Sequence, residues 1–162
     1  MKTILTAILI CIVGNVVYAT SQVPEMLVYG GITNDMYTTP LEALFPEGKP
    51  RAFVEKPSST ACWRGYVGTW KIEDDWLFLI SLKEGYPQTG AIPLRKVNPE
   101  WETPVKATWF NGTIRIGKGK VLMGGMGFNE KRETDIFFEI KNGKVVSTRK
   151  VDNTEQKEAA EP

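Results

Sequence analysis

Two strand-like runs that follow one another directly limit what this chain can fold into. They are residues 65–73 and 76–83, and only Asp74-Asp75 separates them. Because aspartate is favoured in tight turns, we predict a hairpin that places Ile72 opposite Leu77. The first run alternates apolar and polar residues, whereas the second is apolar at nearly every position. A strand with two apolar faces must be covered on both sides, which favours a sandwich or a small barrel filled by side chains.

The dipeptide Asn-Gly occurs twice between runs of strand-forming residues. It favours the tight turn that joins two antiparallel strands. We therefore predict one hairpin over residues 105–116, with its turn at Asn111-Gly112, and a second over residues 134–150, with its turn at Asn142-Gly143.

The segment that leads into these hairpins carries turn and helix signals of its own. Gly30-Gly31 predicts a turn within a strand pair over residues 26–37. A short helix is predicted over residues 40–45, with Thr39 as its cap and Glu42 bonded back to the cap amide. Prolines make 46–59 an irregular connection.

A second proline-rich connection spans residues 84–101 and is predicted to be a long loop with a short strand near residues 91–94. Loops on a rigid β scaffold often carry binding residues. After it, residues 120–128 predict a strand whose glycines imply a bulge or a close backbone approach.

These signals add up to about eight or nine short strands and one short helix. The expected fold is all-β: a single-domain antiparallel meander, closed as a small barrel or packed as a sandwich. The β domain is predicted over residues 20–150. Residues 151–162 are acidic and polar, and we expect them to form a disordered tail.

The first 19 residues predict a cleaved secretory signal peptide. Lys2 precedes an apolar run, and Val17-Tyr18-Ala19 provides a small-residue cleavage pattern. The apolar run has about half of the ~20 residues that a membrane span needs. We therefore expect a periplasmic or secreted protein with no membrane span after cleavage.

The composition excludes several kinds of chemistry. The chain has no histidine, so catalytic triads and histidine-based metal sites cannot form. Processing would leave Cys62 as the one cysteine, and its apolar neighbours predict a buried side chain rather than a reactive thiol. We expect no metal and no cofactor, and no enzymatic activity of these types.

Loss of Lys2 with the signal would bring the formal net charge from +1 to zero. No basic stripe is present, so we expect no nucleic-acid partner.

Carboxylates and aromatic side chains remain as candidate functional groups. Asp74 with Asp75, and Asp135 with Glu139, are the pairs that could perform acid–base chemistry, although turn and strand-surface roles explain them as well. Trp70 and Trp76 fit the core of a small β domain.

Trp63 and Trp101 lie outside the predicted strands. Together with Arg64 they are the candidate residues for binding a ligand or partner.

Trp63-Arg64-Gly65-Tyr66, followed by Thr69-Trp70 and Ile72, resembles a motif of small exported bacterial proteins of uncharacterised function. Pro40-Leu41-Glu42 would be a second part of the match. The resemblance covers about half of the mature chain and implies a bacterial source, but it implies no activity.

Three functions stay open at this point. The leading hypothesis is a non-enzymatic exported protein of the cell envelope or secreted space that binds a protein or small ligand through residues 84–101 and the Trp63-Arg64 region. The second is a lipocalin-like carrier of a small apolar ligand, which requires an internal cavity. The third is a carboxylate-based hydrolase acting on glycans, which requires two carboxylates facing each other in one cleft.

Overall fold

The computed structural model describes residues 20–45, 47, 51–54, 59–85, 87 and 90–155. The predicted signal peptide, residues 1–19, lies outside these ranges, as do residues 156–162 of the predicted tail. The strands in chain order are β1 (Glu25–Tyr29), β2 (Ile32–Met36), β3 (Tyr66–Glu73), β4 (Trp76–Glu84), β5 (Ala91–Ile92), β6 (Val105–Lys106), β7 (Gly112–Met123), β8 (Lys131–Lys141) and β9 (Lys144–Asp152). Two 3₁₀ helices, η1 (Pro40–Leu44) and η2 (Leu94–Lys96), lie between strands.

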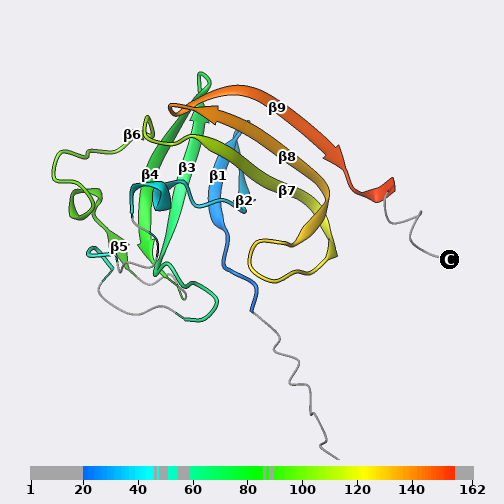
Figure 1. The fold of residues 1–162 in the computed structure, drawn as a ribbon, viewed down its shortest axis with the longest axis horizontal. Helices are drawn as coiled ribbons and strands as arrows, with labels where there is room; N and C mark the ends of the chain where they lie inside the picture. The colour runs from blue at the N-terminus through cyan, green and yellow to red at the C-terminus, as the bar shows by residue number, and fades with distance from the viewer. Residues whose placement is uncertain are drawn as a thin grey trace, which may run out of the picture.

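All nine strands belong to one sheet that closes into a ring (Figure 1). The order around the ring is β3-β1-β2-β7-β8-β9-β4, and β4 returns to β3. The short strands β5 and β6 also pair with β4. All pairs of named strands are antiparallel except β1–β3, which is parallel. The predicted all-β fold is confirmed, and the ring corresponds to the barrel alternative. No helix in the described part of the chain is long and apolar enough to cross a membrane.

The hairpin at the centre of the sequence forms as predicted. Ile72 lies opposite Leu77, and Asp74 and Asp75 both have positive φ angles, +48° and +63°. Two positive φ angles in a two-residue loop match the right-handed twist of the flanking strands. On the outer face of β4, the ammonium group of Lys106 lies 4.1 Å from the centre of the Trp76 ring. The second apolar face of β4 is therefore partly covered.

One of the two Asn-Gly predictions is confirmed and the other is wrong. Asn142-Gly143 joins β8 to β9 with both residues at positive φ. Asn111-Gly112 makes no hairpin: β6 pairs with β4, and Asn111 lacks the positive φ that a tight turn needs. Its side-chain oxygen instead accepts the amide hydrogen of Asn142 at 2.9 Å. The segment before β7 docks onto the other turn rather than folding back on itself.

Gly143 gives a direct test of this docking. Its φ is +78°, and a Cβ added there would lie 2.6 Å from the carbonyl oxygen of Ala107. Gly143→Ala is expected to reduce the free energy of unfolding by about 1–3 kcal/mol, because it adds backbone strain and a steric clash. Gly124→Ala is the matched control, since a Cβ there meets no atom within 4 Å. Urea unfolding followed by tryptophan fluorescence measures both variants, and equal loss in the two would contradict the docking.

The predicted short helix is a 3₁₀ helix without the predicted cap. Thr39 makes no side-chain capping bond, although Pro40 occupies the first turn as expected. Glu42 does not bond back to the cap, because its carboxylate accepts hydrogen bonds from Arg51 and from the Tyr66 hydroxyl. A charged partner and a phenol bind a carboxylate more strongly than one cap amide.

The observed bounds of β7 and β9 differ from the predicted ones. β7 begins at Gly112 and continues to Met123. The glycine-rich segment that begins at Gly124 is therefore a loop and not the end of a strand. β9 continues to Asp152, two residues into the segment predicted as a tail. The bulges in β7, after Lys118 and after Val121, are the irregularity that the glycines implied.

Apolar and aromatic side chains fill the interior of the ring. They come from β1, β2, η1, β3, β4, β7 and β8. The largest that are fully buried are Trp70, Tyr66, Phe138, Leu27, Met36, Leu41, Leu77, Leu79, Leu82, Ile114, Ile116 and Ile140.

Candidate functional site

The candidate residues Trp63 and Arg64 are adjacent in sequence but point to opposite environments. The chain turns here, with the amide of Gly65 donating to the carbonyl of Cys62 at 3.0 Å. Trp63 is 57% exposed, whereas Arg64 is 3% exposed. The turn therefore presents one side chain to solvent and sends the next into the barrel.

Arg64 forms a fully buried ion pair with Glu25, the first residue of β1. The Arg64 Nε donates to Glu25 Oε1 at 3.1 Å, and neither side chain has any exposed surface. Arg64 Nη2 donates to the carbonyl oxygen of Val23 at 2.9 Å, and the Trp70 indole N–H donates to the other oxygen of Glu25. Arg64 Nη1 has no hydrogen-bond partner among the described residues.

Burial controls the titration of this pair. Desolvation raises the pKa of Glu25 from 4.5 to about 7, although the nearby Arg64 charge and the Trp70 and Arg64 hydrogen bonds act to lower it. The carboxyl group of Glu25 can therefore take up a proton near neutral pH.

The expectation that Arg64 contacts a partner directly does not agree with this burial. The side chain is enclosed by the protein, and its guanidinium carbon lies 5.6 Å from the centre of the Tyr66 ring and 5.7 Å from that of Phe128. Arg64 thus joins the start of β1, the start of β3 and the loop before β8. Its role is to position the loops around Trp63.

A second buried polar group lies next to the first. The Tyr66 hydroxyl donates to Glu42 at 2.7 Å, and Arg51 forms an ion pair with the same carboxylate. Burial, followed by the negative charges of Glu25 and Glu42, raises the pKa of Tyr66 well above its usual value. Tyr66 therefore stays protonated and serves as a donor in a structural network.

Gln22 holds Trp63 beside the loop that follows β7. Its side chain accepts the Trp63 amide hydrogen at 3.1 Å and donates to the Thr60 carbonyl at 2.7 Å. The backbone amide of Gln22 donates to the carbonyl oxygen of Gly127 at 2.9 Å. Exposed methionines lie on that loop and at the end of β7: Met126 is 57% and Met123 53% exposed. We call Trp63, Met123 and Met126 the Trp63–Met126 surface.

Trp101 does not join this surface. It is half-buried and stacks on Trp109, with ring centres 4.8 Å apart and an angle of 14° between the ring planes. The Trp109 indole N–H donates to the carbonyl of Pro40 at 3.2 Å. The two tryptophans pack against the hydrophobic core and fasten the end of the 84–101 segment to η1.

The carboxylates named from the sequence lie in a turn or have structural partners. Asp74 and Asp75 are exposed in the β3–β4 turn. Asp135 is buried, with Arg115 at 3.1 Å and Asn153 donating at 2.9 Å. Glu139 is exposed on β8 and accepts a hydrogen bond from Thr113 at 2.8 Å. Within the described residues these pairs do not converge on a shared partner.

Cys62 is buried, as predicted. It has no exposed surface, and its thiol lies 3.3 Å from the carbonyl oxygen of Tyr66. Among the described residues, no cluster of three or more cysteine, aspartate or glutamate side chains could hold a metal ion.

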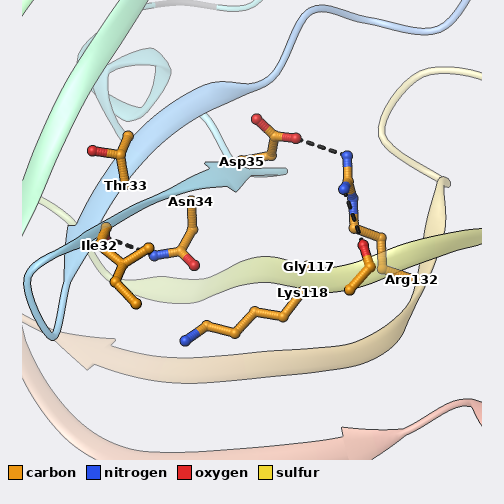
Figure 2. A pocket seen from close by; sticks show the side chains of 8 residues that line it. Ile32, Thr33, Asn34, Asp35, Gly117, Lys118 and Arg132 are labelled. Atoms are coloured by element: carbon orange, nitrogen blue, oxygen red, sulfur yellow. Dashed lines mark hydrogen bonds and ion pairs between the residues drawn. The ribbon is translucent and has the colours of Figure 1, made fainter.

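A shallow pocket of about 350 Å³ opens between β2 and β7 (Figure 2). The two strands pair only at Met36 and Ile116 within the described sheet, and they diverge beyond that point. The pocket is lined by Ile32, Thr33, Asn34, Asp35, Gly117, Lys118, Gly119 and Arg132.

The cation on the β8 side of this pocket is already paired. Arg132 donates to Asp35 at 2.8 Å and to the hydroxyl of Tyr37 at 2.9 Å, and it also pairs with Glu130. Burial and the hydrogen bond to Glu130 raise the pKa of Tyr37 to about 12. No sequence pattern predicts this pocket, because its residues come from strands about 80 positions or more apart that meet only in the closed ring.

No protein-family model, curated protein or solved structure matches this chain.

Proposed function

We propose that this chain is an exported, non-enzymatic binding protein that docks onto a protein partner through the Trp63–Met126 surface. The observation that carries the proposal is the exposure of Trp63. The chain has five tryptophans, all at described positions, and Trp63 alone has more than half of its surface exposed. The export part rests on the sequence of residues 1–19.

An exposed tryptophan held at a fixed place suits binding. Tryptophan is the residue type most enriched among those that dominate protein–protein binding energy. The Trp63 backbone is fixed by Gln22 and by the turn to Gly65, so little conformational freedom is lost when a partner covers the ring. Met123 and Met126 add flexible apolar side chains that adapt to a partner's shape.

The alternative functions receive less support from the geometry. The interior positions that the structure describes are occupied by large buried side chains such as Trp70, Tyr66 and Phe138, which does not favour an apolar-ligand carrier. The carboxylates named for hydrolysis have structural partners or lie in turns, which does not favour a glycosidase.

Photo-crosslinking tests the proposal in the protein as it is exported. Benzoylphenylalanine placed at Trp63 is expected to capture one discrete protein in cells of the organism that encodes the chain. The same group at Ile32, which is equally exposed, is the matched control and is expected to capture none.

The captured protein is then purified and its affinity measured against the full mature chain. Trp63→Ala is expected to weaken binding about thirtyfold or more, since loss of a central aromatic side chain costs about 2 kcal/mol or more. Trp63→Phe should retain most of the affinity. Unchanged affinity in Trp63→Ala would exclude this surface as the docking site.

A further inference from the structure

We propose that the outer edge of β9 accepts an acidic, extended segment of a partner protein by strand addition. This edge is separate from the Trp63–Met126 surface and does not depend on it. In Figure 1, β9 runs along one edge of the molecule, away from the N-terminal segment.

β9 is paired along its whole length on one side only. It pairs with β8 along its whole length, from Lys141 opposite Lys144 to Thr134 opposite Asp152. On the other side it meets β4 at a single position, Trp76 opposite Lys144, and the Val145 amide donates to Asp75 at 2.7 Å. Among the described residues, no strand covers 146–152 on this side. An uncovered strand edge is a template for pairing with another chain.

The alternation along β9 shows which backbone groups are free. The Asn153 amide donates to the carbonyl of Glu133 on β8 at 2.9 Å. Because N–H and C=O groups of alternate residues point to the same side of an antiparallel strand, Arg149 and Val151 also face β8. Thr148 and Lys150 therefore direct their backbone groups outward. The bulge after Val145 reverses this alternation, which explains why the Val145 amide also points outward.

The charge of the edge selects the kind of strand that can join it. Lys144, Arg149 and Lys150 are exposed, and residues 144–151 include no acidic side chain. Within the described residues none of the three forms an ion pair; Arg149 instead lies over the Phe137 ring, 4.3 Å from its centre. Lysines on an edge discourage pairing between two copies of that edge. A strand rich in glutamate or aspartate removes this repulsion, and its opposite-charge cross-strand pairs with the lysines and the arginine stabilise the added strand.

The test uses the full mature chain and a synthetic hexapeptide in which glutamate alternates with valine. The readout is amide hydrogen exchange, residue by residue. The peptide is expected to slow exchange at Thr148 and Lys150 about tenfold, since these amides gain a hydrogen bond. A hexapeptide with lysine in place of glutamate should leave both amides unchanged.

Two variants separate strand addition from charge attraction. Thr148→Pro removes an outward N–H and leaves the β8 ladder intact, so it should abolish the protection of Lys150 by the glutamate peptide. Thr148→Val keeps the N–H and is the matched control. Lys150→Glu changes no backbone group and keeps the proposal testable if the proline variant does not fold: it should weaken binding of the glutamate peptide and allow binding of the lysine peptide.

Three results would overturn the proposal. The first is no protection by the glutamate peptide, and the second is equal protection by both peptides. The third is protection of Thr148 and Lys150 without peptide, together with a dimer in light scattering, which would assign the edge to a second copy of the chain. None of these results bears on the crosslinking at Trp63, so the two proposals can fail separately.

Discussion

Replacing Glu25 with glutamine is expected to destabilise the fold by about 1–3 kcal/mol. The Arg64 Nε and the Trp70 indole N–H donate to different oxygens of Glu25, and glutamine replaces one of these acceptors with an N–H donor. A buried donor that loses its acceptor costs about that amount. Arg64 Nη1 already lacks a partner in the described structure, so the site has no spare acceptor.

Replacing Arg64 with methionine should reduce the free energy of unfolding by less than replacing Glu25 with glutamine. In Arg64→Met the remaining Glu25 carboxyl can take up a proton, because burial already raises its pKa to about 7. The double variant Glu25→Gln/Arg64→Met removes both charges and should recover most of the stability lost in Glu25→Gln, since apolar or neutral replacements of buried pairs are often tolerated.

Urea unfolding at pH 7, followed by tryptophan fluorescence, measures all four proteins in a double-mutant cycle. If Glu25→Gln unfolds at the same urea concentration as the wild type, the ion pair does not hold the loops as described. A greater loss in Arg64→Met than in Glu25→Gln would contradict the asymmetry between the two partners.

The stability of the wild-type protein should also fall by about 3 kcal/mol as pH rises from about 4.5 to about 7. Below this range the Glu25 carboxyl is protonated in the folded and the unfolded chain. Within it, the folded state keeps a proton that the unfolded chain has released, so unfolding releases a proton and becomes easier as pH rises. Above about pH 7 the Glu25 carboxyl is ionised in both states, so its contribution to the free energy of unfolding no longer changes with pH. Each unit of difference between the folded and unfolded pKa is worth about 1.4 kcal/mol. A rise of the Glu25 pKa from 4.5 to about 7 therefore accounts for the loss of about 3 kcal/mol.

Other ionisable groups also contribute to the pH dependence of stability. The double variant Glu25→Gln/Arg64→Met keeps them all and lacks Glu25. Subtracting its pH profile from that of the wild type isolates the contribution of the buried pair. A flat difference between about pH 4.5 and 7 would show that the Glu25 pKa is not raised in the folded protein.

The three hairpins that are predicted correctly depend on short stretches of sequence. Positive φ angles occur at Gly30-Gly31, Asp74-Asp75 and Asn142-Gly143, and the residues on either side of each turn form strands. Everything these turns need lies within a few positions of them. The same reasoning failed at Asn111-Gly112, because its side chain bonds to the other turn, 31 positions away.

The sequence also contained a signal for the buried ion pair. Glu25 lies two positions before Leu27 and four before Tyr29, so the alternation of β1 places all three on one face of the strand. The partner could not be identified in this way, because Arg64 is 39 positions away and is brought to β1 by the parallel pairing of β1 with β3. Arg64 was a candidate for binding because its neighbours suggested a loop, and only burial distinguishes it from Trp63.

The sequence by itself determined the all-β class, the chemistry that a chain without histidine cannot perform, the burial of Cys62 and the three correct tight turns. These follow from composition and from local backbone preferences. Only the tertiary structure decided that the sheet closes into a ring, that Arg64 is buried while Trp63 is exposed, and that β9 keeps a free edge. Closure, burial and free edges depend on contacts between distant strands, and the free energy of such contacts is not encoded in any short stretch of the chain.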